Sequence, residues 1–256
     1  MNKNTSSKKI YLYALLLLIM ARPEITWAKD LLLLSDDGPP HMIEATKGGI
    51  DIDITREVLQ SMGHNVRVGF VPLKRSMKQV ANKEADLFLP TFFQQDTEEL
   101  FISAPIISYR PTIFTLKENN FVIEEISDLS GKMIITFQGA TGYFGDEFMK
   151  VSKNSAYQEL PDMSILPEML IKKRCDVVIL DYYIFYYFLQ KYLKQNPKVP
   201  FEHRNIKNTS LFPAVQAHVG FNNSQLRDQF NEQLVKYKNS NKDKAVIHKY
   251  IAPILN

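Results

Sequence analysis

The fold is decided by two segments, RSMKQVANKEADLFLPT at residues 75–91 and SILPEMLIKKRCDVVILD at residues 164–181. Each pattern predicts an amphipathic helix, then a charged turn, then a short apolar run that ends at a polar residue. The runs Leu87–Leu89 and Val177–Leu180 are too short and too uniformly apolar for half-exposed strands, which predicts buried strands of a parallel sheet. Because a helix leads into a buried strand twice, the chain is expected to form two similar α/β lobes.

Neighbouring segments extend the first lobe in a strand–helix–strand order. The apolar run Leu31–Leu34 predicts a buried strand, and Asp53 is expected to cap a helix over Ile54–Met62. Val66–Val71 alternates like a strand, and Pro72 starts the helix of the first segment. Right-handed crossovers between successive strands would then produce a parallel sheet.

The remainder of the chain continues this alternation. Strands are predicted over Thr112–Leu116, Met133–Phe137, Ala156–Leu160 and Val215–Phe221. Helices are predicted from Asp146, over Tyr182–Leu193, after the capping residues Asn222–Ser224, and over Ala245–Ile251. Ligands of open α/β sheets bind beyond the carboxyl ends of the strands, which places a candidate site near Thr91 and Asp181. Two such edges facing each other would form a cleft.

The first 28 residues are predicted to be an export signal. Three lysines precede the apolar run Ile10–Met20, and Thr26–Ala28 offers a cleavage site with small residues. The run is shorter than the roughly 20 residues that a spanning helix needs, although an uncleaved membrane anchor is the alternative. No cysteine stands near residue 28, so the pattern favours a freely diffusing periplasmic protein over a lipid-anchored one.

Charge and cysteine content narrow the classes of partner. Residues 1–28 hold four of the 31 basic residues and one of the 28 acidic residues, which leaves 27 of each and no basic excess for nucleic acid. Cys175 is the single cysteine, so no intramolecular disulfide can form, and its place before a buried strand predicts an inert, packed thiol. We expect neither a metal nor a cofactor.

A series of motifs in fixed order resembles the polar-amino-acid type of bacterial extracellular solute-binding protein, the periplasmic receptors of ABC importers. The motifs are GPPH, GGIDIDITREVLQSMG, VPLKRSMKQVANKEAD, FISAPI, DLSGKMIITFQGATG, CDVVILDYY and VGFNNSQLRDQFNEQL. The resemblance covers residues 30–256 and implies two doubly wound α/β lobes joined by two hinge strands that close on a ligand. It places lobe one at residues 29–115 plus 213–256 and lobe two at residues 116–212.

The resemblance also assigns roles to polar residues at the strand ends. The segment Gln138–Gly142 follows a strand and precedes a helix, and in the family it holds the ligand carboxylate, with Thr141 at the hydroxyl position. Asp181 corresponds to the residue that accepts hydrogen bonds from the ligand ammonium. From the residues alone, the first segment is equally an ordinary strand-to-helix turn, and Asp181 a helix cap.

One departure from the family concerns arginine. Members of the family usually carry an arginine after the strand that matches Leu87–Leu89, where it binds the α-carboxylate. This chain has no arginine between Arg75 and Arg110. Lysine or glutamine replaces a bidentate clamp poorly. Either Arg75 reaches the cleft, or it is a solvated surface residue and the ligand lacks an α-carboxylate in that position.

The remaining candidates each have a structural alternative. Asp37 either contacts the ligand or forms a turn, and His41 either stacks on the ligand or is an exposed loop histidine. Phe92 and Tyr182 are expected to wall the cleft, although the helix after Tyr182 also has the spacing of a core helix. Thr91 offers its hydroxyl or its backbone carbonyl.

These observations predict a monomeric periplasmic protein that traps a small polar, zwitterionic solute by hinge closure and delivers it to an ABC permease in the inner membrane. A protein coupled to a membrane sensor is the alternative. A periplasmic enzyme such as a dehydratase is a weaker alternative, because the chain lacks the G-x-S-x-G, H-E-x-x-H and C-x-x-C motifs. Its acid and base would have to come from Asp181, His41 and Asp37.

Overall fold

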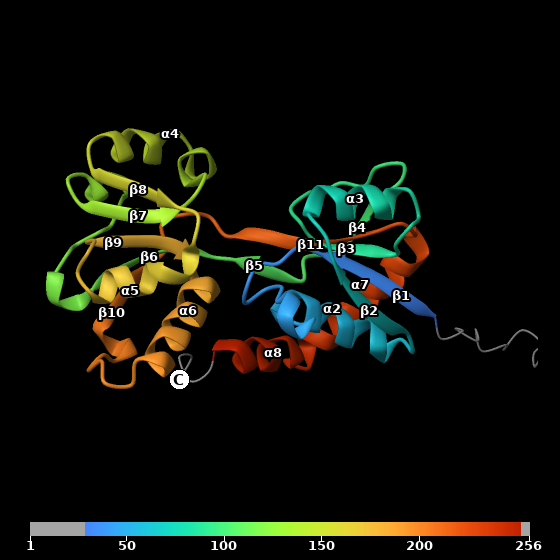
Figure 1. Cartoon of the computed structure of the whole chain (residues 1–256). Coiled ribbons are helices and arrows are strands. Elements are labelled where there is room, and N and C mark those ends of the chain that lie inside the picture. Colours follow the sequence, from blue (N-terminus) through green and yellow to red (C-terminus); the bar gives the residue numbers. More distant parts are fainter. Residues whose placement is uncertain (1–28, 252–256) are drawn as a thin grey trace, which may run out of the picture.

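The structure is a computed structural model that describes residues 29–251, and it has two α/β lobes (Figure 1). One lobe is built on a six-stranded sheet and the other on a five-stranded sheet. The predicted fold class, two doubly wound α/β lobes, is confirmed. The predicted signal peptide at residues 1–28 lies outside the described residues. Within residues 29–251, no helix has both the length and the apolar character needed to cross a bilayer.

The first sheet has the strand order β2-β1-β3-β11-β4, and β5 pairs with β11 beside this path. Its strands are β1 (Asp30–Ser35), β2 (Asn65–Phe70), β3 (Leu87–Thr91), β4 (Phe101–Ile102), β5 (Ile107–Tyr109) and β11 (Val215–Phe221). Its helices are α2 (Ile50–Ser61), α3 (Leu73–Ala81), α7 (Ser224–Asn239) and α8 (Lys242–Ile251). Strand β1 is parallel to β2 and to β3, as predicted, whereas β11 is antiparallel to β3.

The second sheet has the order β10-β6-β9-β7-β8. Its strands are β6 (Pro111–Leu116), β7 (Met133–Phe137), β8 (Ala156–Leu160), β9 (Val177–Asp181) and β10 (Ile206–Thr209). Its helices are α4 (Ala140–Lys153), α5 (Leu166–Ile171) and α6 (Tyr182–Gln195). Short 3-10 helices lie at Glu44–Thr46, Lys117–Asn119, Ile126–Leu129, Met163–Ile165 and His203–Asn205.

The two repeated segments occupy equivalent places in the two sheets. Strand β3 lies between the parallel β1 and the antiparallel β11, and β9 lies between the parallel β7 and the antiparallel β6. All residues of both strands are buried. A continuous apolar run is the sequence signature of a strand that is covered on both faces, which is the environment that both strands have.

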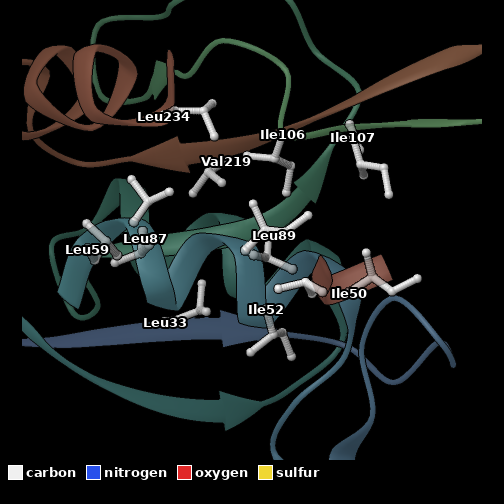
Figure 2. Close-up of a cluster of buried hydrophobic side chains, with 14 of the residues drawn as sticks. Leu33, Ile50, Ile52, Leu59, Leu87, Leu89, Ile106, Ile107, Val219 and Leu234 are labelled. Carbon is white, nitrogen blue, oxygen red and sulfur yellow. The ribbon is translucent and has the colours of Figure 1, made fainter. Parts of the chain in front are cut away.

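Helices cover both faces of each sheet, and successive strand residues alternate between them. Leu31 and Leu33 of β1 pack in one hydrophobic cluster with α2, α7 and α8, whereas Leu34 packs in another cluster against α3. Figure 2 shows Leu33, Leu87 and other side chains of the first cluster between α2 and the strands. In the second lobe, the side chains of β9 likewise divide between two clusters on opposite faces.

The chain passes between the sheets at two places (Figure 1). Strand β5 ends at Tyr109 and β6 begins at Pro111, so one residue, Arg110, separates the first sheet from the second. The return runs from β10 to β11, which pairs with β5. The division of the chain into residues 29–115 plus 213–256 and residues 116–212 stays a prediction. Strand β6, whose first five residues it assigns to lobe one, pairs with β9 and β10 of the second sheet.

One predicted helix start was wrong, and one predicted helix is preceded by a further turn of helix. Helix α2 begins at Ile50 rather than Ile54, and Asp53 lies inside its first turn, where its carboxylate accepts hydrogen bonds from the Lys249 ammonium at 2.8 Å and the Tyr250 hydroxyl at 2.6 Å. Acidic residues are favoured in a first turn because the exposed N–H groups carry partial positive charge. Element α4 consists of two helical segments separated at Gly145, whose φ of 82° is not helical, and the second segment begins at Asp146, as predicted.

Cys175 lies in the turn before β9 and is buried, as predicted from its position. Burial raises the pKa of its thiol to about 12, and the neighbouring Asp176 adds to this shift. Because the thiolate is the reactive form, this environment makes the side chain a packed and unreactive thiol near neutral pH.

Candidate functional site

The ends of the central strands of both sheets meet at a cavity of about 170 Å³. Phe92 follows β3 of the first sheet, Phe137 and Asp181 are the last residues of β7 and β9 of the second sheet, and Tyr109 lies at the crossing between them. Its full lining is Phe92, Tyr109, Pro111, Phe137, Tyr143, Met163, Leu180, Asp181 and Ile184. The cavity therefore has one wall from each sheet, at the strand ends where α/β proteins bind ligands.

Asp181 is buried beside this cavity, and both of its oxygens already accept hydrogen bonds. One oxygen accepts from the backbone N–H groups of Tyr183 at 2.8 Å and Ile184 at 3.1 Å, which caps α6. The other accepts from the backbone N–H of Arg110 at 2.6 Å. The side chain thus joins the start of α6 to the crossing between the sheets, and a carboxylate has further lone pairs with which to accept from a ligand.

His41 connects Asp181 to the first sheet's helices. Its Nδ1 lies 2.7 Å from the Asp51 carboxylate, and its Nε2 lies 3.4 Å from Asp181. Its ring stacks on Tyr109 with centroids 3.9 Å apart, and the Tyr109 hydroxyl donates to Asp51 at 2.8 Å. His41 is 1% exposed, so the alternative of an exposed loop histidine was wrong. The ring is buried because Pro40 and His41 accept backbone hydrogen bonds from the first turn of α2.

The two carboxylates keep His41 charged. Burial alone lowers the pKa of an imidazole, but Asp51 and Asp181 outweigh burial and raise the pKa of His41 to about 9. A histidine whose folded pKa exceeds its ordinary value contributes stability that is complete below pH 6.5 and is lost as the pH rises through 9. This group therefore makes stability depend on pH in the mildly alkaline range.

We expect the free energy of unfolding to fall by about 2–3 kcal/mol between pH 6.5 and pH 9.5, because over most of this range the folded state holds a His41 proton that the unfolded state has released. Urea denaturation at half-unit pH steps measures this slope. The variant His41→Gln removes the titrating group and should flatten it, whereas His248→Gln, at an exposed position of α8, should keep it. An equal slope in wild type and His41→Gln would contradict the assignment.

Several donors of the Thr141 segment already have an acceptor within the protein. The Glu159 carboxylate, from the end of β8, accepts hydrogen bonds from the backbone N–H of Gly139 at 2.7 Å and of Thr141 at 2.9 Å. It also accepts from the Thr141 hydroxyl at 2.6 Å and the Tyr157 hydroxyl at 2.7 Å. Three donors expected to hold an anion, the N–H groups of Gly139 and Thr141 and the Thr141 hydroxyl, are therefore occupied by a side chain of the protein.

The other predicted residues differ in their positions. Asp37 is exposed and accepts a hydrogen bond from the Glu44 backbone N–H at 2.8 Å, which is the turn-forming geometry. Thr91 is buried, and its hydroxyl accepts from the Phe93 N–H at 3.2 Å. Gln138 is exposed, and its backbone N–H donates to the Leu160 carbonyl at 3.1 Å. The structure places these residues near strand ends without bringing their polar side-chain atoms into one cluster.

Phe92 lines the cavity and is 46% exposed, so it is available to a ligand. Tyr182 packs against the hydrophobic clusters of both lobes, and the Arg110 guanidinium lies over its ring at 4.1 Å. Arg75 is exposed on α3, and among the described residues its side chain makes no hydrogen bond or ion pair. The structure therefore does not bring Arg75 to the Thr141 segment.

Sequence reasoning missed three residues of this region: Asp51, Tyr109 and Glu159. Asp51 lies two residues before Asp53, the predicted helix cap. Because α2 begins earlier than predicted, Asp51 is part of the helix and contacts His41. The alternation in AYQEL puts Tyr157 and Glu159 on one face of β8, which was a usable signal. Within residues 29–251, no group of three or more histidine, cysteine, aspartate or glutamate side chains is arranged to hold a metal ion.

A model of one protein family matches residues 33–253, and its description is bacterial extracellular solute-binding proteins, family 3. No curated protein matches the chain. Among solved structures, an ancestral cationic amino acid solute-binding protein superposes with a TM-score of 0.68 at 14% identity, over 87% of this chain and 95% of that one.

Two further structures have the same fold. The L-cystine solute receptor of Neisseria gonorrhoeae, in its unliganded open conformation, gives a TM-score of 0.66 at 17% identity, over 89% of this chain and 94% of that one. The GluR0 ligand-binding core, in complex with L-glutamate, gives 0.63 at 18% identity, over 88% of this chain and 100% of that one. At such identities, the likeness establishes the fold.

Proposed function

Because the chain belongs to family 3 of the bacterial extracellular solute-binding proteins, we propose that it binds a small polar solute, an amino acid or a related amine, between its two sheets. The observation that carries this proposal is the cavity whose lining combines Phe92 of the first lobe with Phe137 and Asp181 of the second. A ligand in this position contacts both lobes at once, so its binding energy favours their closure.

The crossing between the sheets is suited to act as the hinge. One residue separates β5 from β6, and β5 pairs with β11 of the returning segment, so the lobes are joined by two adjacent strands. Hinges of this kind absorb rotation in a few residues at the ends of elements. Asp181 and His41 lie directly beside this crossing, where they would link closure to the position of α6.

The extracellular character of the family agrees with the export signal predicted at residues 1–28, and we propose a periplasmic location. We propose further that it delivers the solute to an ABC permease in the inner membrane, and membership of an extracellular solute-binding family supports this. No step of this function requires bond making or breaking, and we propose that the protein is not an enzyme. Turnover of a bound solute would contradict that part of the proposal.

Thermal-shift screening against amino acids, amines and small organic acids tests the proposed binding. A solute present at about 100 times its dissociation constant stabilises the folded state by about 2.7 kcal/mol, which raises the melting temperature by about 5–10 °C for a chain of this size. The variant Phe92→Ala removes one wall and should weaken the response. Val122→Ala, at a side chain 68% exposed and absent from the cavity lining, should not. A flat response to every amino acid and amine would contradict the proposed function.

A further inference from the structure

The carboxylate of Glu159 has the contacts that a bound ligand carboxylate would need at the Thr141 segment. Both of its oxygens accept hydrogen bonds, one from the Gly139 N–H and the other from the N–H and hydroxyl of Thr141. Four donor groups, including the Tyr157 hydroxyl, converge on this one side chain. A carboxylate held by several donors is a strong, charge-assisted arrangement. A second carboxylate could use these four donors only by displacing Glu159.

Glu159 stays ionised at every pH at which the protein would be assayed. The hydrogen bonds from the Thr141 side chain and the Tyr157 hydroxyl, followed by those from the backbone of Thr141 and Gly139, lower its pKa to about 2. The Thr141 segment is therefore already neutralised by a negative charge that belongs to the protein. A solute with its own carboxylate would meet repulsion there in place of free donors.

The loops around the cavity supply few other groups that bind a carboxylate. Residues 85–109, 133–149 and 175–190 contain neither lysine nor arginine. The guanidinium of Arg110 lies over the rings of Tyr182 at 4.1 Å and Tyr183 at 4.8 Å, and Arg75 is exposed on α3. The positive charge of His41 is enclosed by Asp51 and Asp181.

The groups that do surround the cavity suit a cation. Four of its lining residues are aromatic: Phe92, Tyr109, Phe137 and Tyr143. Aromatic faces attract ammonium and guanidinium groups. The carboxylate of Asp181 also lines the cavity, and an ammonium group can donate a charge-assisted hydrogen bond to it.

We infer that Glu159 is a built-in replacement for the carboxylate of an amino acid, and that the preferred solute is a small organic amine without a carboxylate group. This inference rests on the proposed function and narrows it. The sequence predicted a zwitterionic solute, with an ammonium and a carboxylate group. The cavity retains partners for the ammonium group, whereas Glu159 occupies the partners expected for the carboxylate group.

Matched pairs of an amino acid and its decarboxylated amine test this inference by isothermal titration calorimetry. Suitable pairs are L-arginine with agmatine, L-lysine with cadaverine, and L-tyrosine with tyramine. In the wild-type protein, we expect the amine of any pair that binds to have a dissociation constant at least tenfold lower than that of the amino acid. An amino acid that binds as tightly as its amine would overturn the inference and leave the proposed function standing.

Variants of Glu159 separate its charge from its occupation of the site. Glu159→Ala vacates the donors of Gly139 and Thr141, so the amino acid of the pair should gain at least tenfold in affinity relative to the amine. Glu159→Gln keeps an oxygen acceptor in place and should leave the amino acid weak. Glu168→Ala removes a carboxylate that pairs with Lys172 on the surface of the same lobe. It should leave unchanged the ratio of the dissociation constant of the amino acid to that of its amine.

Circular dichroism confirms that each variant is folded before titration, and the wild-type ratio decides the question if Glu159→Ala does not fold. A ratio that is identical in wild type and folded Glu159→Ala would overturn the role of Glu159. If both members of every pair fail to bind while small dicarboxylic acids bind, the proposed amino acid or amine specificity fails, and the inference fails with it.

Discussion

Replacing Asp181 by alanine is expected to lower the free energy of unfolding by about 3–5 kcal/mol, which is the range for removing one partner from a buried charge pair. The carboxylate is 8% exposed and has partners on three sides. Without it, the N–H groups of Tyr183, Ile184 and Arg110 lose their acceptor, and His41 retains only Asp51 as an opposite charge. Each buried donor left without an acceptor adds its own desolvation cost.

Urea denaturation at pH 7 measures this loss. Asn223→Ala provides the control. Asn223 caps α7 by accepting one hydrogen bond from the Leu226 N–H, and among the described residues its side chain pairs with no charged group. That variant should cost about 1 kcal/mol, the ordinary value of a helix cap. If Asp181→Ala lowers the free energy of unfolding no more than Asn223→Ala does, then Asp181 acts only as a helix cap. In that case its contact with His41 contributes nothing to stability.

The same substitution is expected to weaken solute binding. Asp181 lines the cavity, and its remaining lone pairs are placed to accept from an ammonium group. For the solute identified by screening, we expect the dissociation constant of Asp181→Ala to rise at least tenfold, which corresponds to about 1.4 kcal/mol. Titration of the folded variant with that solute provides the measurement, and an unchanged constant would remove Asp181 from the site.

Replacing Gly49 by alanine is expected to destabilise the protein by about 3–5 kcal/mol, the sum of a left-handed backbone cost and an overpacking cost. Gly49 has a φ of 129°, and a Cβ added there would lie 2.3 Å from the carbonyl oxygen of His41. That oxygen accepts the hydrogen bond from the Asp51 N–H at 3.0 Å, so it cannot move without disturbing the start of α2. The substitution therefore pushes the His41 backbone away from the first turn of α2, which carries Asp51.

Gly63→Ala is the matched control for this effect. Gly63 has a φ of 89° at the end of α2, and nothing lies within 4 Å of an added Cβ. It should show the backbone cost alone, about 1–2 kcal/mol, and should keep the wild-type dependence of stability on pH. Gly49→Ala should also flatten that dependence, because the added Cβ meets the His41 backbone and not Asp51, so it moves His41 relative to Asp51. Equal losses in the two variants would show that the contact with His41 is not the cause.

Much of the fold could be predicted from local composition. The run Val177–Leu180 alternates between two hydrophobic clusters in the structure, and its uniformly apolar character signals cover on both faces. The boundaries of β7 and β8 agree with the predicted segments Met133–Phe137 and Ala156–Leu160. Helix starts were less predictable, because α2 begins where backbone groups of Pro40 and His41 accept its first N–H groups, and these contacts do not follow from the helix sequence.

The candidate site was only partly visible in the sequence. Its strand ends were found, since polar residues after buried strands mark them, and Asp181 and Phe92 do line a cavity. The cluster of His41, Asp51, Tyr109 and Asp181 was not found, because residue 41 and residue 181 become neighbours only after both lobes have formed. Similarly, the segment around Thr141 has the pattern of an anion site, and the partner that fills it comes from another strand.

The amino-acid sequence by itself determined two α/β lobes with central buried strands, because periodicity and apolar runs express which faces of each element are covered. Only the tertiary structure decided which charged side chains contact one another and which donors they occupy. The positions of His41 between Asp51 and Asp181, and of Glu159 on the donors of Gly139 and Thr141, depend on the packing of distant elements. Hydrogen bonds between side chains act over about 3 Å, so only the folded chain specifies them.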